Sequence, residues 1–271
     1  MMRAKVLEER LVRPAVGAEL IRFEHLYKSF GSKHVFEDLN LSVMEGEILT
    51  VMGGSGMGKS VLLKCLIGLL YPESGRIIFE GQDLTELEES DFLHVRRRIA
   101  MVFQGAALFD SLTVGENIAY PLREQFPNMG GEEIAKRVAQ KLQLVNLPGI
   151  EAMRPSDLSG GMRKRVGLAR AIAVDPEVIL WDEPTTGLDP VSAHVIDRLI
   201  LSMKQRLSCT SVVVTHDLDS AFTVSDRIAM IAKKKIVQIG TVNEMKSSTI
   251  TEVRSFFEAR RPARAAAAGA P

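Results

Sequence analysis

A glycine-rich segment with the spacing G-x-x-x-x-G-K-S lies between an apolar run and a helical pattern. Its residues are Gly53, Gly54, Ser55, Gly56, Met57, Gly58, Lys59 and Ser60. Glycines let successive backbone N–H groups turn toward phosphate oxygens, and the N-terminus of the following helix favours the same negative charge. In such a loop the lysine reaches the terminal phosphates and the serine hydroxyl ligates Mg²⁺. The pattern predicts a nucleotide site in which Lys59 and Ser60 take these roles, with Val61 as a further nucleotide contact.

Two carboxylates, Asp182 and Glu183, directly follow the apolar run 178–181. Because neighbouring side chains of a strand point to opposite sides, the two carboxylates need not share a role. We assign Asp182 to Mg²⁺ and Glu183 to the attacking water, which it orients or from which it accepts a proton. A charged strand exit is the alternative explanation for one carboxylate alone, and the phosphate loop upstream weakens it.

A histidine, His216, ends another apolar run, 212–215. Ligands of a parallel sheet gather beyond the carboxyl ends of its strands, so we expect His216 to point toward the γ-phosphate. A lone histidine after a strand is more often structural, and only the neighbouring motifs favour the functional interpretation.

The strands and helices that must position these residues have a pattern typical of an α/β fold. The runs 48–52, 99–103, 178–181 and 212–215 are apolar on successive residues, which is typical of parallel strands buried on both faces. A helix is expected from about Lys59 to Leu70. Residues 115–158 interrupt the alternation, and a helical spacing of apolar residues after Gly130 and Gly131 predicts a helical insert there; these residues are Ile134, Val138, Leu142 and Val145.

Composition sets outer limits on function. The 271 residues carry 34 Lys and Arg against 34 Asp and Glu, so no overall basic charge favours nucleic acid as a partner. The longest stretch without a charged residue is 11 residues, and a membrane-spanning helix needs about 20 apolar residues. The two cysteines, Cys65 and Cys209, are too few for a disulfide scaffold and fit a reducing cytosol.

A further motif, Leu158-Ser159-Gly160-Gly161-Met162, points to a family. Taken with the phosphate loop, Gln104, the Asp182-Glu183 pair, Leu188-Asp189 and His216, its order and spacing resemble the ATP-binding cassette (ABC) ATPases over roughly residues 20–245. The resemblance implies a P-loop NTPase core of RecA-like type with a mainly parallel sheet, an N-terminal antiparallel β region and a helical insert. It also implies that ATP and Mg²⁺ are bound and that two copies of the chain close head to tail.

The resemblance assigns roles to the residues of each matching motif. Ser159, Gly160 and Gly161 resemble the signature sequence, which in that family contacts the γ-phosphate of ATP held by the opposite subunit. Ser159 is also expected to cap the helix that follows. The resemblance places Gln104 near Mg²⁺ and the water and Asp189 at the seam between the two subunits. Phe30 looks like the aromatic residue that stacks on adenine, and an ordinary core phenylalanine is the alternative.

Two departures from the usual family pattern are Met162, where glutamine is usual, and Gly54, where proline is common. Neither removes a catalytic group. The segment 101–122 together with the Leu-Ser-Gly-Gly-Met signature is similar to the ATPases of Mla/Mce-type lipid transporters. That similarity implies a transmembrane permease, a lipid-binding envelope protein, and a peripheral position on the cytoplasmic face of the inner membrane. We expect the permease to dock on residues 107–122.

The resulting division of the chain is a lead-in over residues 1–20, an ABC ATPase domain over 21–245 with its helical insert at about 105–165, and a C-terminal helix and mobile tail over 246–271. Apolar residues at helical spacing predict a short amphipathic helix within 248–257, which packs on its own domain or binds a second ATPase subunit. The basic run 96–98 is expected at a helix C-terminus and the run 233–235 at a hairpin turn. Arg163, Lys164 and Arg165 add positive potential near phosphate or form a solvated helix face.

Three other functions remain open from the residues. An ABC ATPase for another solute would have the same hydrolysis motifs, because the cargo does not touch this chain. A soluble ABC protein of translation or DNA maintenance usually has two cassettes or a long coiled-coil insertion, and neither is present here. A scaffold without hydrolysis is disfavoured because Lys59, Asp182, Glu183 and His216 are all present.

Overall fold

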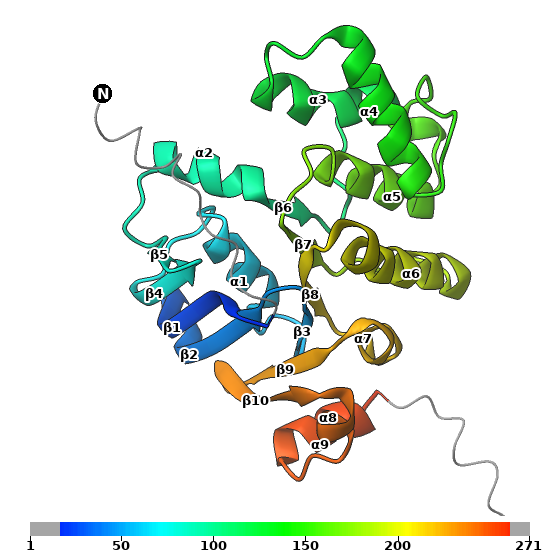
Figure 1. Cartoon of the computed structure of the whole chain (residues 1–271). Helices are drawn as coiled ribbons and strands as arrows, with labels where there is room; N and C mark the ends of the chain where they lie inside the picture. The colour runs from blue at the N-terminus through cyan, green and yellow to red at the C-terminus, as the bar shows by residue number, and fades with distance from the viewer. Residues whose placement is uncertain (1–16, 261–271) are drawn as a thin grey trace, which may run out of the picture.

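The computed structural model describes residues 17–260 of the chain, in which two sheets are joined by helices (Figure 1). A four-stranded antiparallel sheet has the order β2-β1-β4-β5, and a six-stranded sheet has the order β10-β9-β3-β8-β7-β6. The strands of the first sheet are β1 (Glu19–Phe30), β2 (Lys33–Met44), β4 (Ser74–Phe79) and β5 (Gln82–Asp83). Those of the second are β3 (Ile48–Met52), β6 (Ile99–Val102), β7 (Val178–Asp182), β8 (Thr210–Thr215), β9 (Arg227–Ala232) and β10 (Lys235–Thr241).

The six-stranded sheet is parallel except for its edge strand β10, and its central strands are buried on both faces. Alternate residues enter different cores. Leu180 and Val212 pack with the antiparallel sheet and α1 (Lys59–Leu66), whereas Trp181 and Val213 pack with the helices on the other face. This two-sided burial explains why the sequence of these strands is apolar on every residue rather than on every second one.

Helices cover both faces of this sheet. Helix α1 lies between the two sheets, and α6 (Pro190–Leu207) and α7 (Leu218–Val224) lie on the opposite face (Figure 1). Helix α1 ends earlier than the sequence suggested. Gly68 follows it with φ 67, and a Cβ there would lie 2.6 Å from the Phe92 ring, so the chain turns away in a conformation that suits glycine.

A helical subdomain projects from the sheet beyond β6. It consists of α3 (Val114–Gln125), α4 (Gly131–Leu144) and α5 (Gly160–Ala171), with α2 (Glu89–Arg98) before β6 and a single 3₁₀ turn at Pro155–Asp157. Ile134, Val138 and Leu142 are buried on one side of α4, as their spacing predicted. Together with the antiparallel N-terminal sheet and the mostly parallel second sheet, this subdomain confirms the α/β fold class expected from the sequence.

The C-terminal part packs on its own chain. The hairpin of β9 and β10 turns at Lys233 and Lys234, both with positive φ, as the basic run suggested. After α8 (Val242–Lys246), α9 (Thr251–Glu258) buries Val253 and Phe257 in a small core with β9. The amphipathic helix therefore has its apolar face covered within the chain. The expected lead-in and tail lie largely outside the described residues.

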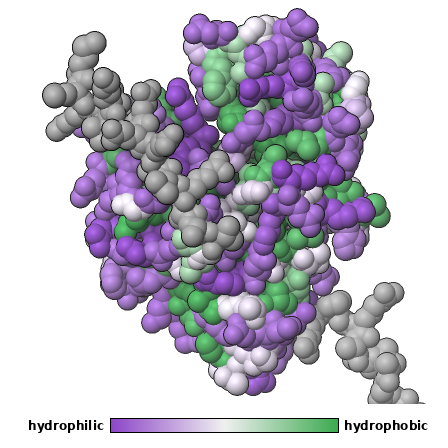
Figure 2. Space-filling view, in the orientation of Figure 1, coloured by the Kyte–Doolittle hydropathy of each residue, from purple (hydrophilic) through white to green (hydrophobic). Residues whose placement is uncertain are grey.

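Hydrophilic side chains cover most of the face shown in Figure 2, with hydrophobic ones among them at the helical subdomain and the C-terminal part. Within residues 17–260, no helix has both the length and the apolar character that crossing a bilayer requires.

One close strand contact in the antiparallel sheet can be tested. A Cβ on Gly75 would lie 2.3 Å from the His25 carbonyl oxygen, whereas Gly81 has a similar positive φ and open space around it. The left-handed conformation alone costs a non-glycine residue about 1–2 kcal/mol. We expect Gly81→Ala to lower the stability by about that amount and Gly75→Ala by clearly more, about 3 kcal/mol or above, because the backbone must also move. Thermal melting of the two variants measures this, and equal melting temperatures would contradict it.

A candidate nucleotide-binding site

The glycine-rich loop connects β3 to α1 and is packed against β2. Gly58 precedes α1 with φ 90, and a Cβ there would lie 2.4 Å from Val35 Cγ1 and 2.7 Å from Phe36 Cε1. Any larger residue would push the loop off the strand beneath it. Packing, in addition to the turn itself, therefore requires glycine at this position.

Lys59 is buried at the first turn of α1, with only 7% of its side chain exposed. Its Nζ donates to the carbonyl oxygens of Gly53, at 3.0 Å, and Gly54, at 3.1 Å, and lies 3.4 Å from Glu183 Oε1. The loop thus curls around its own ammonium group. These carboxylate and carbonyl partners compensate the burial of the Lys59 ammonium group and hold it where an anionic ligand would contact it.

Ser60 and Asp182 lie side by side. The Ser60 hydroxyl donates to Asp182 Oδ1 at 2.6 Å, which joins α1 to the end of β7. Burial raises the pKa of Asp182, the hydrogen bond from Ser60 lowers it, and the neighbouring charge of Glu183 raises it. A hydroxyl beside a carboxylate offers the oxygen ligands that Mg²⁺ prefers.

The donor set fits Mg²⁺ bound together with phosphate. Across residues 17–260 there is no group of three or more His, Cys, Asp and Glu side chains that could hold a metal ion. Mg²⁺ commonly binds through one or two protein oxygens and completes its shell with water and substrate phosphates, as Ser60 and Asp182 would allow.

Glu183 lies between a lysine and a histidine. Its Oε1 faces Lys59, and its Oε2 is 2.7 Å from His216 Nδ1 and accepts a hydrogen bond from Thr186 Oγ1 at 3.1 Å. The Glu183 backbone has φ 49, a left-handed conformation that is uncommon for residues other than glycine. Strained backbone of this kind often occurs where a side chain must be aimed at a reaction centre.

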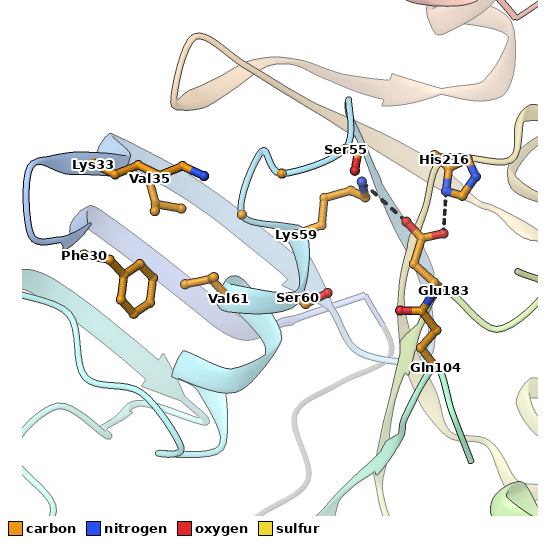
Figure 3. Close-up of a pocket in the computed structure, with 12 residues that line it drawn as sticks. Phe30, Lys33, Val35, Ser55, Lys59, Ser60, Val61, Gln104, Glu183 and His216 are labelled. Atoms are coloured by element: carbon orange, nitrogen blue, oxygen red, sulfur yellow. Dashed lines mark hydrogen bonds and ion pairs between the residues drawn. The ribbon is translucent and has the colours of Figure 1, made fainter. Parts of the chain in front are cut away.

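Lys59, Ser60, Glu183 and His216 line one cavity of about 400 Å³ (Figure 3), and Asp182, which does not line it, is joined to it by the hydrogen bond from Ser60. Its lining residues are Phe30, Lys33, Val35, Ser55, Gly56, Gly58, Lys59, Ser60, Val61, Gln104, Glu183 and His216. Phe30 lies at the opposite end of the cavity from Glu183, and its side chain is not in the core: the residue is 47% exposed, with the Lys28 ammonium 5.0 Å from the ring centroid. An exposed aromatic face beside a phosphate loop is suited to stacking on a base.

Other residues singled out in the sequence lie away from this cavity. Gly53, Gly54 and Met57 belong to the loop without lining it, and Ser159, Gly160 and Gly161 sit at the exposed start of α5. Ser159 caps α5 as expected, accepting from the Met162 N–H at 3.3 Å. Asp189 caps α6 by accepting from the Val191 and Ser192 N–H groups at 3.0 Å.

Sequence reasoning did not identify several contributors. Lys33 and Val35 enter the cavity from β2, the strand after the Phe30 turn. Arg260, at the far end of the described chain, donates to the His216 carbonyl oxygen at 2.6 Å. No spacing in the sequence links these residues to the phosphate loop, because pairing between distant strands and helices brings them there.

The sequence leaves the basic residues 163–165 of α5 either near phosphate or on a solvated helix face; in the structure they are partly or fully exposed, and their side chains also donate to backbone carbonyl oxygens. Arg163 donates to Leu158, Lys164 to the loop after β7, and Arg165 to Asn146 at 3.1 Å. Further along the helix, Arg170 donates to Ala106 and Ala107, just after Gln104. The cations of α5 therefore hold neighbouring loops.

Comparison with known proteins identifies the class. The family model described as ABC transporter matches residues 36–186, which is more than half of the chain. The chain belongs to the ABC transporter family. It is an ATPase of the ATP-binding cassette type that uses ATP with Mg²⁺.

Similarity to individual curated proteins describes the chain's relatives within this family more closely. It is 41% identical to the intermembrane phospholipid transport system ATP-binding protein MlaF of Haemophilus influenzae, over 90% of this chain and 92% of that protein. It is 36% identical to MlaF of Escherichia coli K12 over 89% of each chain. It is also 42% identical to the probable ribonucleotide transport ATP-binding protein mkl of Mycobacterium leprae, over 89% of this chain and 69% of that one.

Solved structures agree with the fold. A dimeric ATP-binding cassette in a post-hydrolysis state with ADP and Pi has a TM-score of 0.76 and 31% identity, covering 82% of this chain and 99% of that one. The protein cbiO1 of Clostridium perfringens, part of the ABC transporter complex cbiONQ, has a TM-score of 0.78 and 28% identity, covering 90% of this chain and 96% of that one.

The role of Phe30 gives a direct test. Stacking of an aromatic side chain on a base is worth about 1–3 kcal/mol, so Phe30→Ala should weaken ATP binding by about 5- to 150-fold. Phe30→Trp should retain most of the affinity. Tyr27→Ala is the matched control, since Tyr27 is also exposed on β1 but does not line the cavity. Titration with a fluorescent ATP analogue measures all three, and equal affinity in the Phe30→Ala variant and the wild type would exclude stacking.

Proposed function

We propose that this chain is the ATP-hydrolysing subunit of a transporter that moves phospholipid between the membranes of a cell envelope. The observation that carries the proposal is the nearly end-to-end similarity to MlaF of Haemophilus influenzae, which covers 92% of that protein's length. The Met162 signature and the segment 101–122, which resemble the Mla/Mce-type ATPases, support the same assignment.

The cavity provides the groups that hydrolysis needs. Lys59 is placed to neutralise charge on the terminal phosphates. Ser60 and Asp182 would hold Mg²⁺, which would offset the negative charge that develops on the transferring phosphoryl group. Glu183 orients the attacking water and accepts its proton, and His216 fixes one oxygen of that carboxylate. Gln104 lines the cavity beside Glu183 (Figure 3) and lies in the chain between β6 and α3, the first helix of the helical subdomain after β6.

The separation of the signature from the cavity supports a head-to-tail pair. Ser159, Gly160 and Gly161 present the exposed N-terminus of α5, a position that favours an anion, yet they do not line this chain's own cavity. A second copy, facing the opposite way, would bring them to the γ-phosphate, with Asp189 at the seam. The related cassette with ADP and Pi is dimeric.

An exposed aromatic pair supports a permease contact. Phe109 and Tyr120 are 43% and 44% exposed, and their rings lie 5.0 Å apart within the segment 107–122. Arg170 packs over Phe109 and binds the loop after Gln104, so a helix docked here would touch the route to the nucleotide. A permease partner places this chain on the cytoplasmic face of the inner membrane, with a lipid-binding envelope protein beyond it.

The cargo distinguishes this proposal from its nearest rival. The mycobacterial relative's name mentions ribonucleotide transport, and the hydrolysis groups would serve either cargo. The balance of 34 Lys and Arg against 34 Asp and Glu does not favour nucleic acid as a partner. We also propose that residues 21–245 form the ATPase domain and that 246–271 form a C-terminal segment.

The Glu183 assignment predicts a large kinetic effect. Glu183→Gln should lower kcat by about 10²- to 10⁴-fold, because the amide cannot accept the proton of the attacking water. ATP binding should persist, since Lys59 and the loop are unchanged. Single-turnover hydrolysis of labelled ATP measures the rate, and Glu132→Gln, on the exposed first turn of α4, is the control. Hydrolysis at the wild-type rate would remove Glu183 from the mechanism.

The permease contact and the cargo can be tested together. Purification of the chain from solubilised membranes, followed by mass spectrometry of bound proteins and lipids, should recover a permease with phospholipid. The double variant Phe109→Glu and Tyr120→Glu should lose the permease and keep ATP binding, because it places charge on the aromatic pair. Leu93→Glu, on exposed α2, should keep both. Recovery of a solute receptor instead of lipid would reassign the cargo, and loss of ATP binding would contradict the docking role.

A further inference from the structure

Lys164 of α5 reaches across to the loop that follows β7. Its Nζ donates to the carbonyl oxygens of Thr186 at 2.6 Å, Pro184 at 2.8 Å and, more weakly, Glu183 at 3.4 Å. An ammonium group has three N–H donors and no acceptor, so these three carbonyls can use its full bonding capacity. The side chain is half-buried, and burial lowers the pKa of Lys164 while the charge of Glu183 raises it.

The three carbonyl oxygens converge because of the loop's conformation. Glu183 has φ 49, and the loop closes on itself through the Thr186 N–H, which donates to the Glu183 carbonyl at 3.3 Å, and the Leu188 N–H, which donates to that of Thr185 at 3.2 Å. Convergent carbonyl dipoles repel one another, and a partly buried carbonyl without a donor is costly. A cation at their centre offsets both effects and stabilises a backbone that is otherwise unfavourable.

The same loop aims the Glu183 carboxylate. One of its oxygens faces Lys59 at 3.4 Å and the other faces His216 at 2.7 Å. The backbone on the N-terminal side of the loop is fixed by the Glu183 N–H, which donates to the Val214 carbonyl at 2.9 Å. On the other side, Lys164 ties the loop to α5, and the Thr185 hydroxyl, which donates to Asp217 Oδ2 at 3.4 Å, ties it to the start of α7.

We propose that Lys164 is a positioning residue that holds Glu183 in the orientation required for hydrolysis. This inference rests on the proposed role of Glu183 as the group that orients the attacking water. Lys164 touches neither the cavity nor the carboxylate, and acts through the backbone of residues 183–186. It also ties α5, whose N-terminus carries the signature, to the loop that aims Glu183, so the two move as one unit.

The geometry favours lysine over arginine. A compact ammonium can meet three carbonyls that converge on a point, whereas the planar guanidinium is suited to forked, bidentate acceptors. Lys164→Arg keeps the charge and should restore only part of the function. Lys164→Met keeps the length of the side chain and removes its donors. Lys136→Met is the matched control, because Lys136 is exposed on α4.

The test measures hydrolysis by the full chain in these variants, each alone and combined with Glu183→Gln. We expect Lys164→Met to lower kcat by about 10- to 100-fold, the scale of a displaced catalytic group, with the KM for ATP changed by less than about threefold. Lys164→Arg should fall between Lys164→Met and the wild type. Combined with Glu183→Gln, Lys164→Met should cause no further loss, because both changes act on one group.

Hydrogen–deuterium exchange provides a readout that does not depend on turnover. The amides of Thr186 and Leu188 should exchange faster in Lys164→Met than in the wild type and in Lys136→Met, while the rest of the sheet keeps its protection. Unchanged exchange and unchanged kcat in Lys164→Met would overturn the proposal. So would a further loss of kcat on top of Glu183→Gln, or a loss confined to KM. Wild-type hydrolysis by Glu183→Gln alone would instead overturn the proposed role of Glu183.

Discussion

The contact of Glu183 with Lys59 and His216 is the interaction on which the site depends. It joins side chains from three separate segments: the start of α1, the end of β7 and the end of β8. Each carboxylate oxygen has a partner, so the group is held between the phosphate-binding lysine and a histidine. A carboxylate in this position can act on water only if all three segments keep their relative places.

The order of the strands in the sheet fixes the relative positions of these three segments. β8 lies between β3 and β7, and its parallel register aligns Met52 with Thr215 and Val214 with Asp182. The carboxyl ends of the three strands therefore meet at one edge, where the phosphate loop, the carboxylates and His216 emerge together. Burial of these strands on both faces fixes their register, since a slip of one residue would exchange the side chains of the two cores.

The helical subdomain is connected to this edge by polar contacts rather than by continuous sheet. Arg170 holds the loop after Gln104, and Lys164 holds the loop after Glu183, so one helix binds the two loops that follow these cavity residues. Ser159, at the N-terminus of that helix, does not line the cavity. Because its cations bind backbone carbonyl oxygens, α5 constrains whole loops. A movement of this helix would therefore be transmitted between the exposed aromatic pair, the signature and Glu183.

The sequence by itself determined the elements and most of the chemistry. Apolar runs on every residue identified the buried parallel strands, helical spacing identified α4, and the glycine spacing identified the phosphate loop, because each depends on local geometry that repeats along the chain. The tertiary structure alone decided which side chains meet. The Glu183–His216 contact, the entry of Lys33 and Val35 into the cavity, and the bond from Arg260 to the His216 carbonyl all depend on packing between distant segments. The function of the basic residues on α5 could not be found in the sequence for a further reason: their acceptors are backbone carbonyls, which every residue carries, so no residue type marks them.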